Sequence, residues 1–357
     1  MMCFIFFEYF ILYFSILILS FLWYSFRDCI SLFFDKYFPF LKHIQSESGV
    51  RMKSFICEMF YKQRAAFEQT YASRGREYPL PEDVTLAEDI FYDEKHVPEH
   101  RLDVYRPKGR EQEVLPVIVN FHGGGLLMGN KEFNRPFCAS LCEAGYVVFC
   151  VEYRLVPDCL FFDQLADLHL ALDYIKEHLS EYGGDISRVY ACGDSGGACL
   201  LTYGAAMQKN KAVAKAAGIT SSDLPIRALG LVSGMFYTNR LDQIGLFLPG
   251  YLYGRHYKKS AFAPYISPEH KDIVESLPPS LLITSENDNL QKYTLDFARA
   301  LRRHQMPHKL INYPKDPRLT HAFSAFYPEL PESKEVIHNI IHFFEHTEED
   351  CKGGNAQ

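Results

Sequence analysis

The sequence has 357 residues, of which 48% are apolar and 23% are charged, so it can bury a large hydrophobic core. Acidic and basic residues are intermixed and leave a net charge of −7, without the basic stripe that would indicate a nucleic-acid partner. The 10 cysteines follow no disulfide or zinc-binding spacing and no Asn-x-Ser/Thr site occurs, which favours reduced thiols in a chain that is not secreted.

Residues 1–51 differ from the rest, and we expect them to form a hydrophobic N-terminal segment. Residues 9–26 carry no charge and would cover roughly 27 Å as a helix, enough to span the hydrocarbon core of a membrane. Basic residues follow this run and none precedes it, so the positive-inside rule predicts a membrane anchor with the remaining chain in the cytoplasm. Alternatively, the true start is Met52, and the protein is then soluble and cytoplasmic.

After this segment, short strands and amphipathic helices are expected to alternate. The first expected helix covers 53–75, in an N-terminal cap region at 52–84. The strands expected after it are short apolar segments at 89–92, 101–105, 114–121, 146–151, 189–192, 228–232, 280–284 and 309–313. The helices expected between and after them lie at 133–143, 163–180, 197–208, 292–304 and 333–346.

This order of elements predicts an α/β fold, with a mostly parallel sheet that helices cover on both faces and that an antiparallel strand pair opens. We expect one catalytic domain over 85–346 and a C-terminal tail at 347–357. Between 209 and 278 the alternation lapses, and aromatic residues are interspersed with Gly and Pro. Such an insertion suits a helical cap over an apolar pocket; a purely structural excursion is the alternative.

The run Gly193-Asp194-Ser195-Gly196-Gly197 lies between an expected strand and an expected helix. Its glycines lack β-carbons, so the chain can turn sharply there and expose the Ser195 side chain at the end of the strand. The Gly196 amide would point with the positive end of the following helix. Ser195 is therefore a candidate nucleophile, and a glycine-rich turn with a solvated serine is the alternative.

A second glycine-rich segment, His122-Gly123-Gly124-Gly125, ends a different expected strand. Its consecutive amides have no side chains to obstruct them, so they can bind the negative oxygen that forms when an ester carbonyl is attacked. Three glycines after a buried strand exceed what a tight turn requires. We expect His122 itself to pack and to form hydrogen bonds rather than to act as a catalytic base.

A nucleophilic serine needs a general base, and that base needs a carboxylate to orient it. Asp288 and His321 follow the last two expected strands, in the order Ser, Asp, His. Because the carboxyl ends of parallel strands meet at one edge of a sheet, both side chains would reach Ser195 there. Glu286 and Asp316 are competing acids.

In these motifs the chain resembles the hormone-sensitive-lipase-like branch of the α/β-hydrolases, over about residues 85–345. The residues that carry the resemblance are His122-Gly123-Gly124-Gly125, Tyr153-Arg154-Leu155-Val156-Pro157, Gly193-Asp194-Ser195-Gly196-Gly197, Glu286-x-Asp288 and His321-Ala322-Phe323. The resemblance implies a serine carboxylester hydrolase for short or medium acyl esters, without a cofactor. It implies Ser195 as the nucleophile, His321 as the base and Asp288 as the orienting acid.

The resemblance also implies oxyanion donors and a substrate pocket. The donors would be the amides of Gly123, Gly124 and Gly196. The N-terminal helix and the insertion would form a cap over the acyl site, and the pocket residues expected there are Leu126, Phe236, Tyr237 and Phe247. The family usually has Gly-Asp-Ser-Ala-Gly-Gly at the elbow, so Gly196 stands where alanine is common, although its amide is retained.

Two other functions stay open on the sequence. An amidase, formamidase or deacetylase for a small metabolite would use the same machinery. A non-catalytic ligand-binding relative is disfavoured, because Ser195, Asp288 and His321 are all present. We expect a small-molecule ester as the substrate, no metal and no nucleic-acid partner, and the oligomeric state is not readable from the sequence.

Overall fold

The computed structural model describes residues 56–347, so the anchor predicted at 9–26 lies outside the described residues. Within 56–347, no helix combines the length and the apolar character needed to cross a membrane. The sheet and the helices around it all belong to the part of the chain that begins at Phe60.

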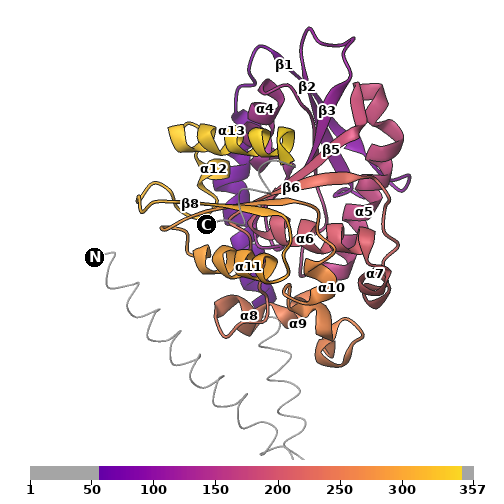
Figure 1. The fold of residues 1–357 in the computed structure, drawn as a ribbon, viewed down its shortest axis with the longest axis vertical. Coiled ribbons are helices and arrows are strands. Elements are labelled where there is room, and N and C mark those ends of the chain that lie inside the picture. The colour runs from indigo at the N-terminus through magenta and orange to yellow at the C-terminus, as the bar shows by residue number, and fades with distance from the viewer. Residues whose placement is uncertain (1–55, 348–357) are drawn as a thin grey trace, which may run out of the picture. The chain divides into compact units, whose positions relative to one another are not determined.

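A single eight-stranded sheet runs through this part, in the order β1-β2-β4-β3-β5-β6-β7-β8 (Figure 1). β2 is antiparallel to both of its neighbours, and all neighbouring pairs from β4 to β8 are parallel. The mostly parallel sheet with an antiparallel entry pair is therefore confirmed. The strands are β1 (Val84–Phe91), β2 (Arg101–Pro107), β3 (Leu115–Phe121), β4 (Val147–Val151), β5 (Gly184–Asp194), β6 (Ile226–Val232), β7 (Ser280–Ser285) and β8 (His308–Tyr313).

Helices cover both faces of this sheet, as expected. α4 and α13 pack against each other on one face, and α5 packs against α6 on the other (Figure 1). Residues 56–67 are also helical and lead into η1 (Glu68–Ala72) and α3 (Ser73–Glu77). The longer helices are α4 (Arg135–Glu143), α5 (Phe161–His178), α6 (Ser195–Lys209), α7 (Lys211–Ala217), α11 (Gln291–Arg303) and α13 (Pro331–Glu345). The shorter ones are η2 (Lys131–Asn134), η3 (Leu179–Tyr182), α8 (Gln243–Phe247), α9 (Pro249–Leu252), η4 (Tyr257–Lys259), η5 (Ala263–Ile266), α10 (Lys271–Val274) and α12 (Phe323–Phe326).

The N-terminal bound of the insertion predicted at 209–278 is wrong. That range contains β6, which pairs with β5 on one side and β7 on the other and so belongs to the middle of the sheet. The excursion out of the sheet covers only 233–279, between β6 and β7, and it contains α8, α9 and α10. The prediction began the insertion too early, because α7 and the loop after it were assigned to the insertion together with the strand expected at 228–232. The other domain boundaries stay predictions.

The order of the parallel strands determines where functional side chains can meet. β3 and β6 flank β5, and β7 and β8 follow on the far side of β6. Their carboxyl ends therefore lie along one edge of the sheet, where ligands bind in open α/β sheets. The glycine-rich segment after β3 and the serine turn after β5 become neighbours at this edge.

Candidate active site

Ser195 occupies the turn between β5 and α6 and adopts a left-handed backbone conformation, with φ of +47°. L-residues rarely adopt this conformation, and strained residues of this kind cluster at functional sites. The Ser195 carbonyl accepts a hydrogen bond from the Met235 amide at 2.9 Å, which ties the turn to the segment after β6. The turn thus holds the serine side chain at the carboxyl edge of the sheet.

The structure brings Ser195 together with the predicted base and acid. His321 Nε2 lies 2.9 Å from Ser195 Oγ, and His321 Nδ1 lies 2.7 Å from Asp288 Oδ1. The Asp288 side chain is fully buried, whereas a quarter of the His321 side chain is exposed. The imidazole therefore connects a buried carboxylate to a hydroxyl, which is the geometry of an activated serine nucleophile.

The Asp288 carboxylate has several hydrogen-bond donors besides His321. Thr284 Oγ1 donates to Oδ2 at 3.0 Å, and the Leu290 amide donates to Oδ1 at 2.8 Å. Burial by itself raises the pKa of Asp288, but the hydrogen bond and the charge of His321, together with the other donors, outweigh it and lower the pKa below its usual value. Asp288 is therefore ionised at neutral pH and can orient the imidazole.

The two competing acids do not reach His321. Glu286 is exposed at the surface. Asp316 instead pairs with Arg318 at 2.8 Å. Among the acids considered from the sequence, Asp288 is the one that contacts the imidazole.

The prediction of Gly123 as an oxyanion donor is wrong, because its amide already donates a hydrogen bond within the protein. The Gly123 N–H donates to Asp194 Oδ1 at 3.0 Å. The amides of Gly124 and Gly125, in contrast, donate to no acceptor within residues 56–347. Gly196 lies in the first turn of α6, where amides lack helical acceptors. The free donors at this edge are therefore Gly124, Gly125 and Gly196, and Gly125 is the one that the sequence-based prediction missed.

Asp194 links the two glycine-rich segments. Besides the Gly123 amide, its Oδ1 accepts a hydrogen bond from Asn134 Nδ2 at 2.9 Å. Burial raises the pKa of Asp194, and the donors Asn134 and Gly123 counteract that effect only in part. Asp194 thereby holds the segment after β3 against the serine turn, a role for which the motif itself gave no signal.

His122 packs and forms hydrogen bonds, as expected. It is fully buried, and its ring stacks on Tyr153 with 4.4 Å between the ring centroids. The Tyr153 hydroxyl donates to the His122 carbonyl at 2.7 Å. Through these contacts with Tyr153, His122 holds the start of the glycine-rich segment in place.

The four predicted pocket residues have different environments. Leu126 is buried, and its carbonyl accepts hydrogen bonds from Val156 N and Gln164 Nε2, both at 3.0 Å. Phe247 is half-buried in α8. These contacts fix the backbone at Leu126 but do not test whether either residue meets a substrate, so both stay predictions.

Phe236 and Tyr237 join the 233–279 excursion to its surroundings. Phe236 stacks on Phe297 of α11 with 4.3 Å between ring centroids. The Tyr237 hydroxyl donates to Glu269 at 2.6 Å. Both rings thus have structural partners, and their role as pocket residues stays a prediction.

Met235 is a residue near the site that no sequence pattern singled out. Its Sδ would lie 3.9 Å from a β-carbon placed on Gly125, and it is the one atom that close, so the space in front of Gly125 is open except for this methionine. A single methionine in an irregular segment carries no signal in the sequence. We expect Met235 to border the space that the acyl group enters.

Comparison with known proteins agrees with this arrangement. A family model described as the alpha/beta hydrolase fold matches residues 118–324, more than half of the chain. This chain belongs to that family. The matched range includes the glycine-rich segment, the serine turn, Asp288 and His321.

Several relatives of this chain are described as esterases. It is 29% identical to a probable isoprenylcysteine alpha-carbonyl methylesterase of Arabidopsis thaliana, over 60% of this chain and 48% of that protein. It is 27% identical to a carboxylesterase of Mycobacterium tuberculosis, over 62% of this chain and 70% of that protein. The chain thus spans about half the length of the plant relatives it matches.

A solved structure with the same fold is an inhibited esterase B of Lactobacillus rhamnosis. It superposes with a TM-score of 0.73 at 25% sequence identity, over 81% of this chain and 96% of that chain. A bacterial heroin esterase also shares this fold, with a TM-score of 0.59 at 22% identity over 79% of this chain and 89% of that chain.

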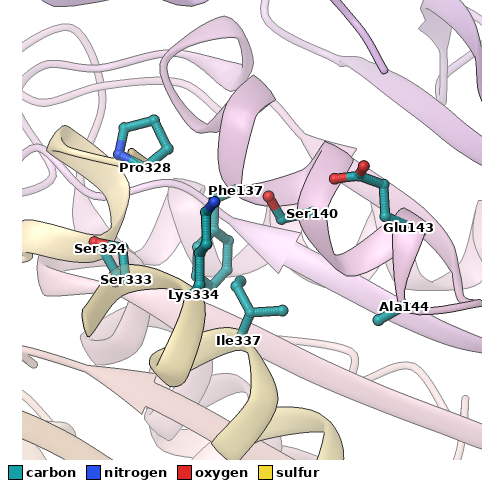
Figure 2. A pocket seen from close by; sticks show the side chains of 9 residues that line it. All are labelled: Phe137, Ser140, Glu143, Ala144, Ser324, Pro328, Ser333, Lys334 and Ile337. Atoms are coloured by element: carbon teal, nitrogen blue, oxygen red, sulfur yellow. The ribbon is translucent and has the colours of Figure 1, made fainter. Parts of the chain in front are cut away.

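The protein also contains a cavity of about 410 Å³ between α4, α12 and α13 (Figure 2). Phe137 and Lys334 line it, and Ser324 borders it from α12. None of the predicted catalytic or pocket residues is among its lining residues. It is therefore separate from the site at Ser195. Within residues 56–347, no group of three or more His, Cys, Asp or Glu side chains is arranged to hold a metal ion.

The departure of this chain from the usual elbow sequence has a physical reason. A β-carbon on Gly196 would lie 2.8 Å from the Leu126 amide nitrogen and 3.0 Å from that of Gly125. The first distance is shorter than real β-carbons show, and the second is unusually short. The segment after β3 therefore approaches the serine turn so closely that alanine at position 196 would require this segment to move.

We predict that Asp194→Ala lowers kcat on p-nitrophenyl butyrate by about a hundredfold, because the Gly123 amide loses its acceptor and the oxyanion donors beside it lose their orientation. Thermal unfolding followed by circular dichroism would show that the variant is folded. Asp194→Asn keeps a carbonyl acceptor and should lose less activity. Near-normal kcat in folded Asp194→Ala would show that this contact does not hold the donors.

Proposed function

We propose that the protein is a serine carboxylester hydrolase that cleaves short to medium acyl esters through an acyl-enzyme intermediate. The observation that carries the proposal is the continuous contact from Ser195 Oγ through His321 to Asp288, with distances of 2.9 and 2.7 Å. The relatives described as a carboxylesterase and a methylesterase support the same bond class. The four expected pocket residues belong to this proposal as predictions.

In the first step, Ser195 Oγ forms a bond to the acyl carbon while His321 Nε2 takes the hydroxyl proton. The negative charge of Asp288, 2.7 Å from His321 Nδ1, stabilises the imidazolium that results. When the tetrahedral intermediate collapses, His321 returns the proton to the leaving alcohol and Ser195 keeps the acyl group. In the second step, water attacks the acyl carbon, His321 takes its proton, and the acid is released as Ser195 is reprotonated.

The negative oxygen of both tetrahedral intermediates would lie in front of Gly124, Gly125 and Gly196. Their amides are free in the described part of the chain and converge from two segments that touch each other. Preorganised donors of this kind stabilise the transition state because they need no reorientation during the reaction. We include Gly125 in place of Gly123, whose amide Asp194 holds.

We predict that Ser195→Ala lowers kcat on p-nitrophenyl acetate and butyrate by at least about 10⁴-fold, because the acyl-enzyme can no longer form. The melting temperature should stay close to that of the wild type. A fluorophosphonate probe should label the wild type once per chain and leave the variant unlabelled. Wild-type protein that neither turns over esters nor takes up the probe would refute the hydrolase proposal and favour a ligand-binding relative.

An amide-cleaving function is the second candidate, and one relative gives it specific support. The chain is 37% identical to a human arylacetamide deacetylase-like protein, over 27% of this chain and 24% of that protein. Esters and amides require the same nucleophile and the same oxyanion donors. The leaving groups differ, because an amine must be protonated as it departs, whereas p-nitrophenolate leaves without a proton.

We predict that kcat/KM for p-nitrophenyl butyrate exceeds that for the matched butyryl p-nitroanilide by at least about a hundredfold, the usual contribution of general-acid catalysis. Esters from acetate to octanoate, measured alongside, would locate the preferred chain length. Equal or greater kcat/KM on the anilide would assign the site to amide hydrolysis.

The location of the enzyme is proposed from the sequence alone. Residues 9–26 would anchor the chain in a membrane, with the catalytic domain in the cytoplasm. We predict that protein expressed from Met1 stays in the membrane pellet after a carbonate wash, whereas protein started at Met52 is recovered in the supernatant. Full-length protein found entirely in the washed supernatant would contradict the anchor.

A further inference from the structure

Ser233 is the first residue after β6 and lies between the strand that precedes Ser195 and the strand that precedes Asp288. It is 1% exposed, and its φ of +49° is left-handed. Its amide donates to the Ile283 carbonyl at 2.8 Å, so the backbone is tied to β7. A serine held in this rare conformation at the functional edge of the sheet calls for a specific role.

Ser233 connects the strand that leads to the acid with the loop that carries the base. Its Oγ accepts a hydrogen bond from the Ala322 amide at 3.0 Å, next to His321 in the sequence. Its own amide donates to Ile283 of β7, the strand that leads to Asp288. Ser233 therefore ties the His321 loop to β6 and β7.

The segment that Ser233 begins also contacts the loop of the nucleophile. Two residues further on, the Met235 amide donates to the Ser195 carbonyl at 2.9 Å. Ser195 and Ala322 share the left-handed conformation of Ser233, with φ of +47° and +50°. The loops of the nucleophile and the base are thus fastened to the segment 233–235, and β7, which leads to Asp288, is bound to the same segment through Ile283.

We propose that Ser233 is a positioning residue for the proposed ester hydrolysis, whose hydroxyl holds the His321 loop at the end of β6 and thereby aligns the imidazole between Asp288 and Ser195. The inference rests on the proposed function. Ser233 is buried beneath the triad, and its assigned role involves no contact with the substrate. Its loss therefore changes the alignment of the base and leaves substrate binding in place.

Removing the hydroxyl would have two consequences at once. The Ala322 amide, whose residue is fully buried, would lose its acceptor. Asp288 would keep its hydrogen bonds from Thr284 and Leu290, so the carboxylate would remain in position. The effect would therefore fall on the His321 loop rather than on the carboxylate.

The test compares Ser233→Gly and Ser233→Ala with the wild type in the full-length chain. Glycine accommodates the left-handed backbone without strain but lacks the hydroxyl, so it separates the hydroxyl from the conformation. We expect kcat on p-nitrophenyl butyrate and the rate of fluorophosphonate labelling to fall about ten- to a hundredfold in both variants, with KM unchanged, since small misplacements of a reacting group have effects of this size. The melting temperature of Ser233→Gly should stay within a few degrees of the wild type.

Ser324→Ala is the matched control. Ser324 is also buried and also lies close to His321 in the sequence, but its hydroxyl has no hydrogen-bond partner within residues 56–347. We expect kcat of Ser324→Ala to stay within about twofold of the wild type. This control separates the loss of the Ser233 contact from the general effect of removing a buried hydroxyl near the base.

The proton NMR signal of the His321 Nδ1 hydrogen, shared with Asp288, gives a readout that a purely structural role would not move. It should shift or broaden in both Ser233 variants and stay in place in Ser324→Ala. Folded Ser233→Gly with wild-type kcat, or with a raised KM and unchanged kcat, would overturn the inference. A wild type without esterase activity or labelling would instead refute the proposed function, so the two failures are distinguishable.

Discussion

The close packing of two glycine-rich segments against each other is the constraint on which the rest of the site depends. The segment after β3 and the turn after β5 touch where Gly196 faces the amides of Gly125 and Leu126. Asp194, a residue of the second segment, maintains this contact, because its carboxylate accepts a hydrogen bond from the Gly123 amide of the first. The free amides and the nucleophile are consequently parts of one rigid unit, and neither can be displaced without the other.

The acid and the base approach this unit from the other side of β6. Their loops follow β7 and β8, which lie successively further from β5 in the sheet. Both loops must therefore extend across the end of β6 to reach Ser195. The segment after β6 contacts the loops of Ser195 and His321 and is hydrogen-bonded to β7, the strand that leads to Asp288. The triad is therefore held by a buried backbone segment that itself contains none of its members.

Much of this organisation could be predicted from the sequence, because it depends on periodic patterns and chain order. All eight strands appear at the expected places, since apolar runs in a buried parallel sheet are easily recognised. The order of Ser195, Asp288 and His321 along the chain predicted their meeting, because strand ends converge at one edge. The bounds of the insertion at 209–278 were misjudged, because they included the strand expected at 228–232, which pairs with β5 in the sheet.

The parts that could not be predicted depend on contacts between distant residues. The pattern of three glycines does not indicate which amide a carboxylate 71 positions later will occupy, so Gly123 was chosen where Gly125 is free. Ser233 and Asn134 are ordinary polar residues in sequence, and only their burial beside Asp288 and Asp194 distinguishes them. The sequence identifies the donor or acceptor groups of a side chain, but the tertiary fold determines which residue it contacts.

The missing β-carbon at Gly196 also restricts how this protein can diverge. A mutation to alanine there would collide with Leu126 before any other change could make room, and moving the glycine-rich segment first would leave Gly196 facing a gap. The two segments are therefore expected to change together rather than one at a time. Alanine at position 196 is thus compatible only with a glycine-rich segment that lies further from the serine turn.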